Sequence, residues 1–304
     1  MSRPDDSSLT PSQLARVRKE AERALREGGV LGILPTPSQA ILAVARLREV
    51  EEDVLNPTFI QRILGKAERA GQVVKRAVSK VLGLFHASEG LVFLDQALIL
   101  VRKRFVRFHE AGHGFLPWQR SMYAVVEDGE QQLDPEAAEL FDREANIFAS
   151  EVLFQLDTLH DMADAQPFGI LTPVNLAPRF GASIYAAIRQ YVYKNHRACV
   201  VLVLEMPEIN PVTGFRAKLR RAVQSTRFTA VFGTPTWQDA YTPEDDIGAL
   251  VPLGKRKMSG KRQLALTDAN GTRHECLAES FTNQRQVFVL IHAVKTLTAT
   301  HILL

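Results

Sequence analysis

The sequence predicts a mixed α+β fold: a mainly helical first part with a small antiparallel sheet, then a helix-turn-helix-like segment and a β-rich α+β C-terminal domain. Before Cys199, apolar residues recur at the spacing of amphipathic helices. After Cys199 they come in short continuous runs bounded by turn residues, as buried strands do. A chain of 304 residues that is 46% hydrophobic and 23% charged has ordinary globular composition and is long enough for two domains.

Charge, cysteine content and hydropathy exclude several classes of protein. The 37 basic and 34 acidic residues leave a net charge of only +3, which does not indicate a nucleic-acid-binding protein. Cys199 and Cys276 lie far apart and outside any pairing motif, so we expect reduced thiols. No apolar run approaches the ~18 residues of a membrane span, and the polar start lacks the apolar core of a signal peptide. These features predict a cytoplasmic protein without a membrane partner.

Capping residues predict the first helices, after a disordered start over residues 1–9. A Thr-Pro pair at one end and a Gly-Gly pair at the other predict a helix over residues 10–28. A proline-containing break followed by a serine cap predicts a second helix over 38–52, and two more are expected over 57–71 and 72–81.

Two short apolar runs, Leu82–Phe85 and Leu91–Leu94, follow these helices and are separated by a polar segment that contains glycine. This pattern predicts a β-hairpin. An edge strand at this place could pair with an extended peptide, or the strands could serve only to cover the next helix. The sequence leaves both roles open.

The next helix carries an H-E-x-x-H motif made of His109, Glu110 and His113. Its apolar residues recur with helical spacing, at Val101, Phe105, Phe108 and Gly112. On a helix, residues four apart lie on one face about 6 Å apart along the axis, so both imidazoles can reach one metal ion. Zinc accepts such nitrogen ligands and lowers the pKa of a bound water, whose proton the glutamate can take as general base. The motif therefore predicts a zinc hydrolase.

The third protein ligand is expected from the next long helix, which a polar loop separates from the motif and which an Asp-Pro pair opens at Asp134. The apolar positions of this helix are Ala138, Phe141, Ala145, Phe148 and Val152. A rotation of 100° per residue places Asp142 and Glu144 on the two flanks of this apolar face and turns Glu139 away from it. Helical periodicity thus leaves two candidate carboxylates, and either could instead be a solvent-facing acid.

The segments His109–His113 and Glu144–Ala149 resemble the ImmA/IrrE family of zinc metallopeptidases, in which an H-E-x-G-H helix precedes a helix written E-x-x-A-N-x-F-A. The resemblance covers roughly residues 75–200 and implies a zincin-like peptidase domain over 10–170 with Zn²⁺ as cofactor. The family's third ligand falls on Asp142, where this chain has aspartate in place of glutamate, with Glu144 as the alternative. The family's Leu-Met-Pro is also absent after this helix, so the chain is a divergent member.

The resemblance implies site-specific cleavage of a regulatory protein, typically a DNA-binding repressor, in stress response or regulation. Besides the metal, such a reaction needs a group that stabilises the oxyanion, and the sequence offers Tyr123, His160, Tyr185 and His196. The alternative function is a non-catalytic regulator or interaction module on a degenerate peptidase scaffold, and the aspartate at position 142 keeps this alternative open.

Residues 171–198 show a helix-turn-helix-like pattern, with a glycine in the turn and a second helix that opens at Ser183. The first turn of this second helix, Ile184–Ala187, offers almost no polar side chains to bases, so we expect a packing role and no direct DNA binding.

Residues 199–304 form the predicted C-terminal domain, for which the resemblance implies a sensor-like or recruiting role. The runs Cys199–Leu204 and Val287–Ile291 predict buried strands, and Asn270-Gly271 predicts a hairpin turn.

Overall fold

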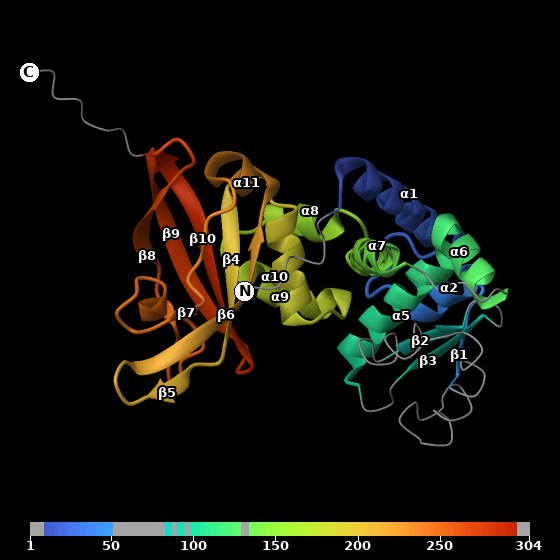
Figure 1. Ribbon diagram of the computed structural model, residues 1–304, viewed down its shortest axis with the longest axis horizontal. Coiled ribbons are helices and arrows are strands. Elements are labelled where there is room, and N and C mark those ends of the chain that lie inside the picture. The colour runs from blue at the N-terminus through green and yellow to red at the C-terminus, as the bar shows by residue number, and fades with distance from the viewer. Residues whose placement is uncertain (1–8, 51–82, 87–89, 95–97, 129–133, 297–304) are drawn as a thin grey trace, which may run out of the picture. The chain divides into compact units, whose positions relative to one another are not determined.

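The computed structural model describes residues 9–50, 83–86, 90–94, 98–128 and 134–296 (Figure 1). The chain divides into two compact units. The N-terminal unit holds Asp6–Leu159 and Ala177–Ser183, and the C-terminal unit holds His160–Leu176 and Ile184–Leu304. Helices dominate the first unit and an antiparallel sheet the second, so the predicted mixed α+β class is confirmed. Within the described ranges, no helix has the length and apolarity that crossing a membrane requires.

The N-terminal unit consists of helices and a three-stranded sheet in the order β1-β3-β2. Its elements are α1 (Pro11–Glu27), α2 (Ser38–Val44), β1 (Arg48–Val50), β2 (Gly83–His86), β3 (Leu91–Leu94), α5 (Leu100–Phe115), α6 (Pro117–Asp128) and α7 (Pro135–Leu153). The strands β2 and β3 pair antiparallel, which confirms the predicted hairpin, and β1 pairs parallel with β3. Helix α5 packs between this sheet and α7, and α1 packs against α7 (Figure 1).

Two helix starts, at Thr10 and Asp134, follow the predicted caps, but the predicted cap Ser38 is wrong: it is the first residue of α2, the N-cap position is Pro37, and no side chain caps this helix. The Thr10 hydroxyl accepts a hydrogen bond from the backbone N–H of Gln13 at 3.3 Å, and the Gln13 side chain accepts one from Thr10 N–H at 2.9 Å. This reciprocal pair is a capping box. Asp134 caps α7 through the backbone N–H groups of Glu136 and Ala137, with Pro135 in the first turn.

Two predictions about this unit are wrong. The helix expected over 38–52 ends at Val44 because Arg46 adopts a left-handed backbone conformation (φ 58°), and Arg48–Val50 then pair with β3 as a strand. The polar loop expected after the motif is the helix α6, because Pro117 at its first position has the backbone angle that a helix start requires. The helices predicted over 57–71 and 72–81 lie outside the described residues, as does the chain up to residue 8.

The C-terminal unit contains an antiparallel sheet in the order β5-β6-β4-β10-β9-β8, with β7 paired to β6. Its strands and helices are α10 (Ile184–Tyr193), β4 (Cys199–Glu205), β5 (Glu208–Asn210), β6 (Gly214–Gln224), α11 (Thr226–Phe232), β7 (Ala240–Tyr241), β8 (Arg262–Thr267), β9 (Arg273–Thr282) and β10 (Gln286–Thr296). The hairpin predicted at Asn270-Gly271 joins β8 to β9, and Gly271 has the positive φ (81°) that the turn requires.

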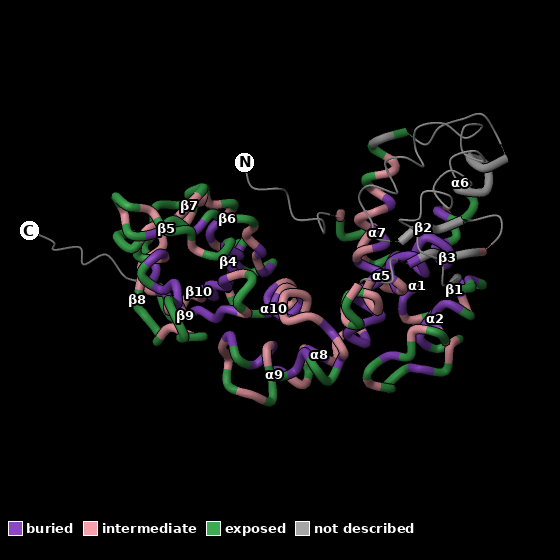
Figure 2. Tube along the Cα trace, turned by 90° about the horizontal axis from the view of Figure 1, so that it is seen from below, coloured by how far each residue is buried: buried purple, intermediate pink, exposed green. Residues whose placement is uncertain are grey.

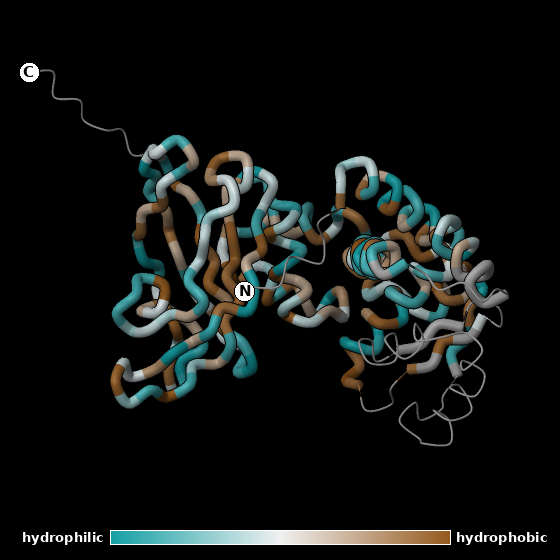
Figure 3. The backbone as a smooth tube through the Cα atoms, viewed as in Figure 1, coloured by the Kyte–Doolittle hydropathy of each residue, from teal (hydrophilic) through white to brown (hydrophobic). Residues whose placement is uncertain are grey.

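Strand β4 is a continuous apolar run (Figure 3), and burial on both sides of the sheet explains it. Val200, Leu202 and Leu204 pack in one core with Phe228 and Phe232 of α11. On the other side Phe288, which pairs with Val203, lies against Tyr185 of α10, with ring centroids 6.3 Å apart.

The helix-turn-helix-like pattern corresponds to α9 (Leu171–Phe180), a turn in which Gly181 has a positive φ of 59°, and α10. Helix α10 packs on β4 and β6 and buries Ala187, Ile188, Tyr191 and Val192. This face is therefore occupied by the protein's own sheet, in keeping with a packing role. The chain passes between the two units within α8 (Thr158–Asp164), within α9, and again between Ser183 and Ile184.

Candidate metal centre

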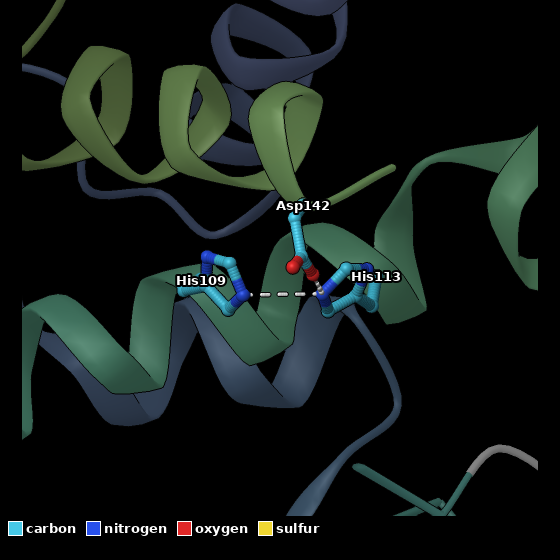
Figure 4. A group of neighbouring side chains, drawn as sticks. All are labelled: His109, His113 and Asp142. Atoms are coloured by element: carbon cyan, nitrogen blue, oxygen red, sulfur yellow. Dashed lines mark hydrogen bonds and ion pairs between the residues drawn. The ribbon is translucent and has the colours of Figure 1, made fainter. Parts of the chain in front are cut away.

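Helix α5 presents the H-E-x-x-H residues from its second half, which is buried from Phe108 to Phe115 (Figure 2). The rings of His109 and His113 lie edge to face with centroids 4.8 Å apart, and their Nε2 atoms are 3.2 Å apart (Figure 4). Two nitrogens held about 2.05 Å from a tetrahedral zinc ion would be about 3.3 Å apart. The observed separation therefore suits ligands of a single ion.

Helix α7 brings Asp142 to these histidines. The Asp142 Oδ1 atom lies 3.8 Å from His113 Nε2, and the ligand atoms of the three residues all lie within 4.8 Å of one another. The close approach of the two helices occurs at Gly112, where a Cβ atom would lie 3.2 Å from the Ala145 Cα atom. Because Gly112 has no side chain, the backbone of α7 comes near enough for a short aspartate to reach the histidines.

Hydrogen bonds fix the tautomer of each ring. His109 Nδ1 lies 3.1 Å from Asn146 Oδ1, and His113 Nδ1 lies 2.7 Å from Gln119 Oε1. An amide oxygen only accepts hydrogen bonds, so in the neutral rings each Nδ1 carries the proton and each Nε2 keeps its lone pair. Two buried lone pairs 3.2 Å apart repel each other unless a cation lies between them. The donor set thus fits a metal ion.

Burial also sets the charge of the site. It lowers the pKa of His109 to about 3, with a further contribution from neighbouring His113, whose own pKa burial also lowers against the opposing effect of Asp142. Both imidazoles are therefore neutral at neutral pH, the form that binds metal. Burial and the nearby charge of Asp142 raise the pKa of Glu110 to about 8. Asp142 supplies the negative charge of the cluster, and its side chain is 41% exposed.

Glu144 is placed differently from Asp142. It is fully buried, and its carboxylate oxygens accept hydrogen bonds from Arg16 (3.0 Å), Trp118 (2.6 Å) and Gln119 (2.8 Å). It is not among the described residues whose ligand atoms gather at the histidines. Glu139 is exposed, in agreement with the periodicity of the helix.

Three residues of this centre were not foreseen from the sequence: Asn146, Gln119 and Arg16. Asn146 stands within the A-N pair of the family's second pattern, which is the one signal that could have pointed to it. Gln119 lies in a segment that was predicted as a loop, and Arg16 is one of many charged residues of α1. Neither position carries a local signal of its role.

The four candidates for oxyanion stabilisation are divided between the two units. His160, Tyr185 and His196 belong to the C-terminal unit, and the side chain of Tyr123 lies outside the described residues. His160, Asp164 and His196 form a second group whose ligand atoms lie within 4.8 Å of one another, and both Asp164 and His196 are exposed.

Comparison with known proteins agrees with the motifs. Residues 72–190 match the sequence model of a peptidase family described as the IrrE N-terminal-like domain, which confirms the resemblance. No curated protein matches the chain. A solved structure of a Mycobacterium tuberculosis transcriptional regulator is similar, with a TM-score of 0.50 and 12% identity over 94% of this chain and 81% of that chain. At this identity the similarity concerns the fold alone.

Proposed function

Because the chain carries an IrrE N-terminal-like domain over residues 72–190, we propose that it is a zinc-dependent endopeptidase that hydrolyses a peptide bond in a regulatory protein. The observation that carries this proposal is the gathering of His109, His113 and Asp142, with their ligand atoms within 4.8 Å of one another. The protein substrate implied by the family resemblance is a DNA-binding repressor, and the C-terminal unit would recruit it or regulate access to the site. We place the reaction in the cytoplasm, where Cys199 and Cys276, both free and buried, stay reduced.

In this proposal His109, His113 and Asp142 hold the ion. When bound, zinc supplies a Lewis acid that polarises the peptide carbonyl and acidifies a water molecule. Glu110 takes the proton of that water on its carboxylate and passes it to the leaving amine. It must be ionised to do so, and a cation close to its carboxylate opposes the effect of burial and favours the charged form. The partly exposed Asp142 marks the side from which a peptide can approach.

The test compares the wild type with Glu110→Gln, which keeps the size of the side chain but cannot accept a proton. Both proteins are loaded with zinc and given a library of internally quenched peptides, and zinc content is measured in parallel. We expect equal zinc content and cleavage lower by about 10²–10⁴-fold in the variant, the usual contribution of a general base. His113→Ala is the control that should lose both zinc and cleavage.

Two results would count against the proposal. Cleavage by Glu110→Gln at the wild-type rate would remove the assigned base. A wild type that binds zinc but cleaves neither the peptides nor purified repressors would support the alternative, a regulator on a peptidase scaffold. The partly exposed aspartate in place of the family's glutamate favours this alternative.

A further inference from the structure

Gln119 has all its hydrogen-bonding groups engaged, although it is fully buried. Its amide nitrogen donates to the Phe141 carbonyl oxygen at 3.2 Å and to Glu144 Oε2 at 2.8 Å. Both partners are acceptors only, so turning the amide around would place its oxygen against two buried acceptor oxygens. The Gln119 oxygen must therefore face His113 Nδ1, from which it accepts a hydrogen bond at 2.7 Å.

The carboxylate that holds Gln119 depends in turn on α1. A buried carboxylate costs much free energy unless it is paired, and the cation paired with Glu144 is Arg16, at 3.0 Å. The guanidinium of Arg16 stacks 3.8 Å from the centroid of the Trp118 ring, while the Trp118 indole N–H donates to the same carboxylate at 2.6 Å. Arg16 is half exposed and lies outside the residues that match the peptidase family.

We propose that the series Arg16–Glu144–Gln119–His113 is a positioning chain through which helix α1 sets the tautomer and orientation of His113, and thereby the metal affinity of the site. The inference rests on the proposed function, since it assigns residues that act on the metal through a ligand. None of the first three residues belongs to the group of candidate ligands His109, His113 and Asp142. The role of Glu144 is thus to hold Gln119, which in turn orients the candidate ligand His113. A partner or ligand that displaced Arg16 would weaken the site from a distance.

If these contacts only held α1 against α7, then the loss of any ion pair between the two helices would change zinc affinity to the same extent. Arg18 provides the matched control. It lies on the same helix α1 and pairs with Glu151 of α7 at 3.4 Å and with Asp157, and neither partner is a member of the series Arg16–Glu144–Gln119–His113. Replacing Arg18 by methionine therefore removes an ion pair between the same two helices and leaves the positioning chain in place.

The first experiment measures zinc affinity by competition with a chromophoric chelator, in a His196→Ala background so that the second histidine cluster gives no signal. We expect Gln119→Leu to bind zinc about 10–100-fold more weakly, the usual cost of removing an outer partner of a ligating histidine. Arg16→Met should weaken binding by several-fold to about tenfold, and Arg16→Lys should restore most of it because the charge returns. Arg18→Met should bind zinc like its parent, even if it melts at a lower temperature.

The second experiment needs no metal. In the apoprotein, nitrogen-15 NMR of the histidine rings should show the proton of His113 on Nδ1 in the wild type and in Arg18→Met, and a shift towards the other tautomer in Gln119→Leu. Unchanged tautomer and unchanged zinc affinity in Gln119→Leu would overturn the positioning chain. Equal zinc affinities for Arg16→Met and Arg18→Met would overturn the part assigned to α1. A wild type that binds no zinc, yet shows the expected tautomers, would refute the proposed function and leave the positioning of His113 standing.

Discussion

At the scale of single residues, the candidate centre combines two neutral donors with one charged donor. Burial lowers the pKa of His109 and of His113, so Asp142 is the one member of the cluster that would bring negative charge to a bound ion. Glu144, only two residues further along α7, is bound instead to Arg16 and Gln119. The difference between the two carboxylates is therefore one of partners.

This difference predicts how substitutions at the two positions behave. Asp142→Ala should lower zinc affinity by more than about 100-fold, beyond the cost of losing an outer partner. Asp142→Glu should keep zinc, because the longer carboxylate matches the residue that the family pattern has at this place. Zinc per chain after dialysis measures both effects. Glu139→Ala, an exposed carboxylate of the same helix, is the control and should bind zinc fully. Full zinc binding by Asp142→Ala would show that the third ligand lies elsewhere.

How much of the centre could be predicted follows from the same residues. Two histidines four residues apart lie on one face of any α-helix, so the pairing of His109 and His113 could be predicted from the sequence. Helical periodicity reduced the acids of α7 to Asp142 and Glu144, but it could not tell which flank of α7 turns towards α5. That choice depends on the packing of Gly112 against Ala145, which is a property of the folded unit. The role of Gln119 depends on packing in the same way.

At the scale of secondary-structure elements, two helix starts that are marked by capping residues were predicted correctly. Caps at Thr10 and Asp134 gave the starts of α1 and α7, because capping is decided within a few residues. The three-residue strand β1 was missed because it is held by pairing with β3, which is distant in sequence. The contact between α5 and α7 is the element-level feature on which the centre depends.

Gly112→Ala tests this contact. The new Cβ would lie 3.2 Å from the Ala145 backbone and from Phe148, so α7 must shift and move Asp142 and Asn146 relative to the histidines. Crowding of this kind costs about 1–3 kcal/mol of stability, against a gain of about 1 kcal/mol from the better helix propensity of alanine. We expect a modest loss of stability and a clear loss of zinc affinity.

Gly114→Ala is the matched control for this substitution. Its Cβ would come within 2.9 Å of Leu47 Cδ1, the flexible end of a side chain in the segment between α2 and β1, which can move without shifting α7. Zinc affinity should therefore stay close to that of the wild type. If both alanine variants lost zinc equally, the effect would come from damage to α5 and not from the position of α7.

At the scale of the whole molecule, each of the two units carries its own natural probes. Trp118 belongs to the N-terminal unit and Trp237 to the C-terminal unit, and both cysteines lie in the C-terminal unit. Burial raises the pKa of Cys199 to about 12 and that of Cys276 to about 11, so neither thiol ionises at neutral pH in the folded protein. Thiol labelling thus reports unfolding of the C-terminal unit.

These probes predict where zinc acts on stability. An ion that binds only the folded N-terminal unit stabilises it by about 2.7 kcal/mol at a free concentration of 100 times Kd, which corresponds to an increase of about 5–10 °C in Tm. In a Trp237→Phe variant, Trp118 fluorescence should show this increase when zinc is added after chelation, and His113→Ala should abolish it. In a His196→Ala background, which removes the second histidine cluster, thiol labelling of Cys199 and Cys276 should begin at the same temperature with and without zinc, because the two cysteines lie in the C-terminal unit and His109, His113 and Asp142 lie in the N-terminal unit. If labelling shifted together with Trp118 fluorescence, the two units would unfold as one cooperative body, and zinc in the first would stabilise the whole chain.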